Sequence, residues 1–170
     1  MKYRYPVALA LASAAAPGMA ANLAVKVELP QLNVAEYHRP YLAMWLETAD
    51  QQFAGNLSVW YDLKKKDNAG TKWLNDMRQW WRKSGRELTL PVDGVSSATR
   101  APGEHTLVFA DNKTVVGKLA PGAYQVVVEV AREAGGRELV RVPLQWPPKG
   151  EQQTSAQGKG ELGKITVIAK

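Results

Sequence analysis

The stretch that decides the fold is YQVVVEVAREAGGRELVRVPLQW, residues 124–146. Its two arms, 124–131 and 138–146, are rich in β-branched residues and alternate between apolar and other side chains. That period of two is typical of half-buried strands. The small residues Ala134, Gly135 and Gly136 lie between the arms and favour a tight turn. The sequence therefore predicts a long β-hairpin in the second half of the chain.

Shorter segments of the same kind recur along the rest of the chain. Leu23, Val25, Val27 and Leu29 alternate with less apolar residues, and Pro30 ends this first expected strand. Residues 50–55 favour a turn. Further strands are expected at 41–47, 57–63, 106–109, 114–116 and 164–169. Seven or more strands separated by turns predict a mainly β fold, an immunoglobulin-like β-sandwich.

One segment has helical rather than strand periodicity. Thr71 before it is a suitable N-cap, and Gly85 after it is a suitable terminator. The sequence therefore predicts one α-helix inserted into the sandwich near the middle of the chain. Five apolar residues recur at helical spacing on its predicted inner face: Trp73, Leu74, Met77, Trp80 and Trp81.

The first twenty residues have the pattern of a secretory signal peptide. A basic start with Lys2 and Arg4 precedes an apolar run at 7–16 and small residues at 17–21. The run is too short to span a bilayer, so we expect cleavage after Ala20 or Ala21 and no membrane span in the mature protein. Residues 21–170 are expected to form a single periplasmic domain. The segment at about 147–163 has few apolar residues and is expected to be flexible.

Composition narrows the classes of function. The chain has no Cys, which excludes disulfides and thiol chemistry. The formal charge of +6 falls to +4 when Lys2 and Arg4 leave with the signal. A modestly basic exported protein fits an anionic ligand or an acidic partner rather than nucleic acid. No catalytic nucleophile, zinc or phosphate-binding motif is recognisable, so the sequence gives no positive reason to expect a free-standing enzyme.

The most informative loop spans residues 91–103. Pro91 and the Pro102-Gly103 pair enclose it, so neither helix nor strand is expected inside it. Its centre, DGVSSAT at 93–99, resembles the acceptor motif of FMN-binding domains that are modified by the periplasmic FAD:protein FMN transferase. In those domains a Thr hydroxyl carries FMN through a phosphodiester bond.

The resemblance extends to individual residues of the loop. Asp93, Ser96, Ala98 and Thr99 match the motif, and the match makes Thr99 the candidate acceptor. Ser97 departs from it, standing where such domains usually have Gly, and the Arg100-Ala101 pair that follows departs as well. Arg100 could offset the negative charge of the phosphodiester, or it could be an ordinary solvated loop charge.

Across nearly all of the expected mature chain, the order of features resembles a bacterial exported family, the domain-of-unknown-function family 2271. The resemblance rests on residues 34–41, 59–63, 71–74, 78–82 and 92–103. It implies two partners, the FMN transferase and a PepSY-type membrane reductase. The leading hypothesis is therefore a periplasmic electron-transfer protein that carries FMN covalently on Thr99. In that hypothesis Trp73, Trp80 or Trp81 could stack on the flavin ring, although such residues more often form the core face of a helix.

Two other hypotheses stay open. The first is a cofactor-free immunoglobulin-like binding or assembly module of the cell envelope. The second is a periplasmic metal-binding accessory that would use His38 and His105, the two histidines of the chain. Two His without a tight spacing are a weak metal pattern, and each fits an ordinary structural role. Only the flavin hypothesis requires the hydroxyl of Thr99.

The signal peptide gives the first prediction. Signal peptidase should release a protein that begins at Ala21 or Asn22, because the small residues that it requires lie just before these positions. N-terminal sequencing of the protein from the periplasm checks this. A protein that keeps Met1 and stays in the cytoplasm would contradict it.

Overall fold

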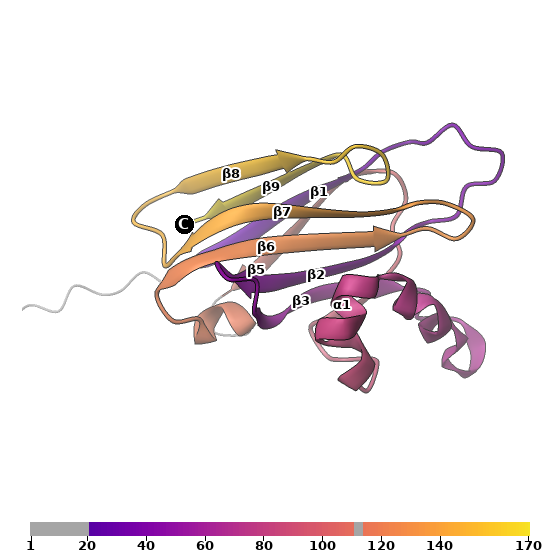
Figure 1. Cartoon of the computed structure of the whole chain (residues 1–170), viewed down its shortest axis with the longest axis horizontal. Coiled ribbons are helices and arrows are strands. Elements are labelled where there is room, and N and C mark those ends of the chain that lie inside the picture. The colour runs from indigo at the N-terminus through magenta and orange to yellow at the C-terminus, as the bar shows by residue number, and fades with distance from the viewer. Residues whose placement is uncertain (1–20, 111–113) are drawn as a thin grey trace, which may run out of the picture.

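The structure is a computed structural model of the chain, and it describes residues 21–110 and 114–170. The predicted signal peptide lies outside these residues. Two β-sheets pack face to face, and a helical segment covers one outer face (Figure 1). No helix in the described part of the chain is long and apolar enough to cross a membrane.

The strands are β1 (Asn22–Leu29), β2 (Tyr41–Thr48), β3 (Phe53–Tyr61), β4 (Ser96–Ala98), β5 (Gly103–Ala110), β6 (Gly122–Ala131), β7 (Arg137–Trp146), β8 (Gln152–Gln157) and β9 (Lys164–Ala169). The helices are the 3₁₀ helices η1 (Lys66–Asp76), η2 (Gly85–Glu87) and η4 (Val115–Lys118), and the α-helix α1 (Arg78–Lys83).

The predicted β-sandwich is confirmed. One sheet has the strand order β5-β1-β9-β8 and the other the order β4-β3-β2-β6-β7. Neighbouring strands are antiparallel except β3 and β4, which run parallel. The hairpin predicted from residues 124–146 is formed by β6 and β7, which pair without interruption from Gly122 opposite Trp146 to Ala131 opposite Arg137.

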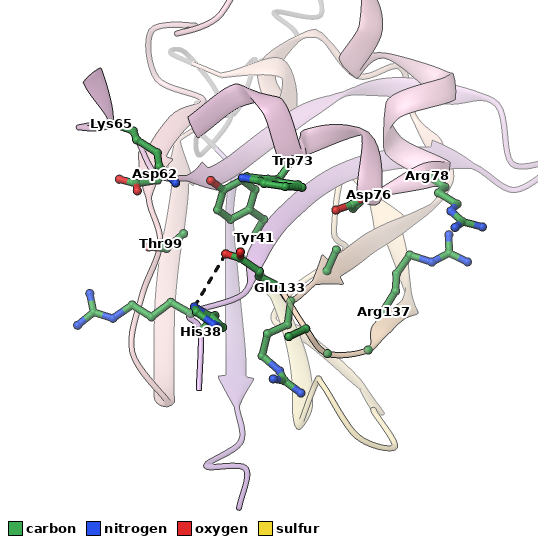
Figure 2. A pocket seen from close by; sticks show the side chains of 16 residues that line it. His38, Tyr41, Asp62, Lys65, Trp73, Asp76, Arg78, Thr99, Glu133 and Arg137 are labelled. Atoms are coloured by element: carbon green, nitrogen blue, oxygen red, sulfur yellow. Dashed lines mark ion pairs between the residues drawn. The ribbon is translucent and has the colours of Figure 1, made fainter. Parts of the chain in front are cut away.

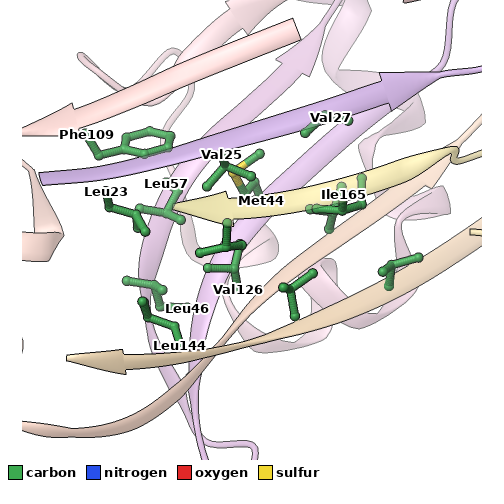
Figure 3. Packing of buried hydrophobic residues seen from close by; sticks show 14 of the residues in the cluster. Leu23, Val25, Val27, Met44, Leu46, Leu57, Phe109, Val126, Leu144 and Ile165 are labelled. Atoms are coloured by element: carbon green, nitrogen blue, oxygen red, sulfur yellow. The ribbon is translucent and has the colours of Figure 1, made fainter. Parts of the chain in front are cut away.

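The main core lies between the two sheets (Figure 3). Leu23, Val25 and Val27 point inward from β1, as their alternation predicts, and are fully buried. Met44 and Val126 are among the residues that face them from the other sheet. Burying a side chain of this size contributes about 1.5–3 kcal/mol, so this layer accounts for much of the stability of the sandwich.

A second core lies on the outer face of the five-stranded sheet. Six consecutive residues of β2, Leu42 to Glu47, are buried because alternate side chains enter different layers. Leu42 and Met44 pack between the sheets, whereas Ala43 and Trp45 pack beneath the helical segment. The sheet therefore has no solvent-exposed face in this region.

The predicted single helix is wrong in its extent. The segment consists of η1, α1 and η2, and the backbone at Met77 (φ −79°, ψ 73°) departs from helical geometry between the first two. Since the axis changes direction there, the apolar residues do not form one stripe. Leu74, Met77 and Trp80 are fully buried against the sheet, while Trp73 remains 37% exposed.

Two further expectations differ from the structure. Residues 115 and 116 belong to η4 instead of a strand, and Thr114 is its N-cap, whose side chain accepts a hydrogen bond from the Val116 N–H at 3.3 Å. The segment 147–163, expected to be flexible, contains the edge strand β8. Its alternate residues are only half-buried, so backbone pairing with β9 can hold it in the sheet without apolar side chains.

The two tryptophans give a prediction on stability. Trp80→Ala should lower the free energy of unfolding by about 3–5 kcal/mol because it opens a cavity in the second core. Trp73→Ala should lower it by no more than about 1 kcal/mol because that side chain is largely at the surface. Denaturant unfolding of both variants measures the difference. Equal midpoints for Trp80→Ala and the wild type would show that the helical segment is not packed on the sheet.

Candidate functional site

The loop at 91–103 contains a strand that the sequence analysis excluded. Ser96–Ala98 forms β4 at the edge of the five-stranded sheet, parallel to the end of β3. The N–H of Val59 donates to the carbonyl of Val95 at 2.8 Å, and the N–H of Thr99 donates to the carbonyl of Tyr61 at 3.3 Å. Pro91 and Pro102 therefore limit the length of the strand, but they do not prevent a three-residue pairing between them.

The acceptor-like residues are accessible in different degrees. Asp93 and Ala98 are exposed, whereas Ser96, Thr99 and Arg100 are half-buried. The Ser96 hydroxyl accepts a hydrogen bond from the Val92 N–H at 2.9 Å and closes the turn before the strand. The Thr99 end of this stretch is thus held to the sheet but reachable from solvent.

Ser97 is not strained. It lies in β4 opposite Trp60, in extended backbone, and the positive φ angles of this loop belong to Gly94 at 72° and Gly103 at 135°. A Gly at position 97 would be needed only for a left-handed conformation, which this loop does not adopt there. The departure of Ser97 from the acceptor motif therefore leaves the backbone undistorted.

Thr99 lines a cleft of about 540 Å³ (Figure 2). The cleft lies at one end of the five-stranded sheet, where β2 and β7 begin and β3, β4 and β6 end, and its walls come from segments far apart in the sequence. They are the loop before β2, the end of β3, the helical segment and the β6–β7 hairpin. The other lining residues are His38, Arg39, Tyr41, Asp62, Lys65, Trp73, Asp76, Arg78, Ala131, Arg132, Glu133, Ala134, Gly135, Gly136 and Arg137.

Two aromatic side chains form the apolar part of the cleft wall. Tyr41 at the start of β2 and Trp73 in η1 both line the cleft (Figure 2). Burial raises the pKa of the Tyr41 phenol, and the nearby Asp62 carboxylate adds to the increase. Tyr41 is therefore a neutral hydroxyl at physiological pH. A large exposed indole and a half-buried phenol together suit a planar ligand.

The cleft has an excess of positive charge. Its lining includes five arginine or lysine side chains and three carboxylates. Arg132 is paired with Glu161 at 2.8 Å, and Arg137 contacts Glu129 at 3.3 Å. Within the described residues Arg78 makes no ion pair or side-chain hydrogen bond. The arrangement favours an anionic ligand over a cationic one.

A buried carboxylate positions the cationic end of the cleft. Glu129 is fully buried on β6 and accepts hydrogen bonds from the backbone N–H groups of Gln79 at 3.0 Å and Trp80 at 2.8 Å. The same carboxylate pairs with Arg137. Because Gln79 follows Arg78 directly, Glu129 fixes the positions from which both arginines extend.

The opposite wall depends on a second buried pair. Arg132 donates to both carboxylate oxygens of Glu161, at 2.8 and 2.9 Å, and its guanidinium lies 5.9 Å from the centroid of the Tyr37 ring. Burial alone would raise the pKa of Glu161, but the hydrogen bonds from Arg132 and from the Gly136 N–H outweigh it and lower that pKa. The pair joins the β6–β7 turn to the segment before β9.

Other candidates from the sequence lie elsewhere. The Arg100 guanidinium lies 4.4 Å from the centroid of the Trp60 ring and does not line the cleft. The His105 ring lies edge-on to the Trp60 ring, with the two centroids 5.7 Å apart, and its Nε2 lies 2.7 Å from the carbonyl of Ala101.

His38 has carboxylate neighbours instead. Its Nε2 lies 3.3 Å from Glu36, and its Nδ1 lies 3.9 Å from Glu133. In residues 21–110 and 114–170 no group of three or more His, Cys, Asp or Glu is arranged to hold a metal ion. The metal hypothesis therefore has no support from the described geometry.

Most of the cleft cannot be located from the sequence. Arg78 and Arg137 were not singled out, because they come from two segments about sixty positions apart and only the fold joins them. The one available signal was the modest surplus of basic residues in an exported chain, which indicated an anionic ligand without locating it.

Comparison with known proteins identifies a family model that covers most of the chain. The model described as "Predicted periplasmic protein (DUF2271)" matches residues 22–164. No curated protein and no solved structure matches the chain. The match covers strands β1 to β8 and the residues of the cleft.

The Arg132–Glu161 pair gives a prediction on pH dependence. Since the pKa of Glu161 is lowered in the folded protein, its contribution to stability is complete above the ordinary pKa of a glutamate. It is lost as the pH falls through the lowered value. Glu161→Gln should therefore lower the free energy of unfolding by about 1–3 kcal/mol at neutral pH, and the difference should shrink in acid.

Urea unfolding at a series of pH values measures this difference. Glu151→Gln is the matched control, because Glu151 pairs with Lys170 on the exposed surface and should contribute about 0.5 kcal/mol or less. A Glu161→Gln difference that stays constant down to strongly acidic pH would contradict the assignment.

Proposed function

The chain belongs to the DUF2271 family of predicted periplasmic proteins, and we propose that it carries FMN covalently on Thr99 and transfers electrons in the periplasm. The observation that carries the proposal is the position of Thr99. The last residue of the acceptor-like stretch 93–99 is also a lining residue of the cleft. A flavin attached there would have a site beside it in the same domain.

The attachment is a group transfer from FAD. The Thr99 hydroxyl oxygen attacks the phosphorus atom of the FMN half, the bond to the AMP phosphate breaks, and AMP leaves. The transferase supplies the base that takes the hydroxyl proton, and its metal ion offsets the charge of the pyrophosphate. This chain contributes the nucleophile and its presentation.

The structure of the acceptor segment favours access of the transferase to the Thr99 hydroxyl. β4 has three residues and lies at the edge of its sheet, with a partner on one side only. An edge segment with so few backbone hydrogen bonds can separate locally without unfolding the domain. Ala98 before the acceptor is exposed and small, so little bulk would block entry into the transferase.

The cleft fits an FMN group in size and chemistry. Its volume of about 540 Å³ falls within the roughly 300–1,000 Å³ of typical small-molecule sites. Tyr41 and Trp73 offer ring surfaces, and the excess of positive charge suits a phosphodiester. When bound, FMN supplies one- and two-electron chemistry, while the protein supplies position and electrostatics. The electrons would come from a PepSY-type membrane reductase, the partner that the family resemblance implies.

Co-expression with the FAD:protein FMN transferase tests the proposal. The exported protein should gain the mass of one FMN less one water, and its yellow colour should survive denaturation. Thr99→Val should abolish the gain because Val keeps the shape of Thr but lacks the hydroxyl. Thr89→Val, in the exposed segment before the same loop, is the matched control and should be modified like the wild type.

An unmodified mass after co-expression with an active, cognate transferase would refute the proposal. The cofactor-free binding or assembly module would then become the leading hypothesis. Modification that persists in Thr99→Val would show instead that another hydroxyl, such as that of Ser96 or Ser97, is the acceptor.

A further inference from the structure

The aromatic residues and the arginines occupy different parts of the cleft, and the attachment of FMN to Thr99 does not by itself explain this arrangement. In Figure 2, Tyr41 and Trp73 lie between Thr99 on one side and Arg78 and Arg137 on the other. All five residues line the same cleft. An elongated ligand joined to Thr99 would therefore pass the two aromatic rings before it reached the two guanidinium groups.

The aromatic part of the cleft is incompletely covered. Trp73 is 37% exposed, although Leu74, Met77 and Trp80 of the same helical segment are fully buried. The Lys72 ammonium lies 5.0 Å from the centroid of the Trp73 ring. A large ring left accessible in a concave site is available for stacking with a planar ligand.

The guanidinium groups of Arg78 and Arg137 extend toward the same side of the cleft in Figure 2. The Glu129 carboxylate lies 3.3 Å from the Arg137 guanidinium and also accepts hydrogen bonds from two backbone N–H groups. Asp76 also lines the cleft, but no described carboxylate pairs with Arg78. Two like charges on rigid supports, of which only Arg137 has a paired carboxylate among the described residues, form a site for an anionic group.

Resting on the proposed attachment at Thr99, we propose that this cleft holds the flavin ring against Trp73 and Tyr41, with its pyrimidine edge toward Arg78 and Arg137. Reduction of a flavin by two electrons and one proton leaves a negative charge on that edge. Positive charge beside it stabilises the reduced form and raises the midpoint potential. Arg78 and Arg137 are then binding residues that set the potential of the carrier.

The backbone positions of Arg78 and Arg137 are fixed by contacts with Glu129. Arg78 begins α1, whose first backbone N–H groups are held by Glu129, and Arg137 begins β7 and pairs with the same carboxylate. Neither backbone has to move to accept the ring. The charge is preorganised, which makes its effect on a bound anion larger than that of a flexible surface arginine.

The test uses protein flavinylated by co-expression, and the mass of each sample is measured first. The FMN attached to Arg78→Gln should have a lower midpoint potential than the FMN of the wild type, measured against reference dyes with dithionite as the reductant. Arg82→Gln is the matched control, because Arg82 is an exposed arginine of the same helix that does not line the cleft. Its potential should equal that of the wild type.

A second pair of variants tests the position of the ring. Trp73→Leu should raise flavin fluorescence severalfold and weaken the visible circular dichroism, because the stacked indole quenches the ring and makes its surroundings asymmetric. Phe53→Leu, which removes another exposed aromatic residue outside the cleft, should leave both signals unchanged. Denaturant midpoints check that all four variants are folded.

The outcomes separate the two proposals. Absence of attached FMN by mass overturns the proposed function and this inference with it. Full attachment, with wild-type potential in Arg78→Gln and wild-type fluorescence in Trp73→Leu, overturns the inference alone and places the ring outside the cleft. A lower potential and a brighter flavin in these variants, but not in their controls, support it.

Discussion

The geometry of the cleft depends on the hydrogen bonds of the buried Glu129 carboxylate. This carboxylate lies among valines on β6 and is fully buried, a position that is unfavourable for a charge unless hydrogen bonds replace its water. Two backbone N–H groups of α1 and the guanidinium of Arg137 supply those bonds. A single side chain therefore joins the helical segment, the central sheet and the cleft.

A second buried carboxylate holds the other end of the same helix. Glu47 on β2 contacts Lys83 at 3.2 Å, Arg141 at 3.0 Å and the indole N–H of Trp45 at 3.0 Å. Burial would raise the pKa of Glu47, but these hydrogen bonds outweigh it and lower that pKa. A six-residue helix is unstable in isolation, so α1 exists because the sheet binds both of its ends. Trp80 can then fill the second core between them.

Sequence periodicity located the strands better than it located the site. The alternation of β1 and of the β6–β7 hairpin is visible because each pattern is local. The break at Met77, by contrast, comes from fitting the helical segment to a sheet, and no residue there is a helix breaker. The edge strands β4 and β8 also lack a local sequence pattern, because they are held by backbone hydrogen bonds and need no alternating apolar side chains. The cleft depends on Arg78 and Arg137, whose proximity is a property of the tertiary fold alone.

Under the proposed function, the acceptor-like strand and the cleft have opposite mechanical requirements, and different parts of one sheet suit each of them. An acceptor hydroxyl must enter a second enzyme and then return, so it belongs on a short edge segment such as β4. A site that sets the potential of a cofactor must not move, so its charges belong where buried carboxylates fix the backbone. Thr99 follows the edge strand directly and also lines the cleft. In the proposed function, the place of modification and the place of electron transfer are therefore neighbours, and one chain can serve the transferase once and the redox partner thereafter.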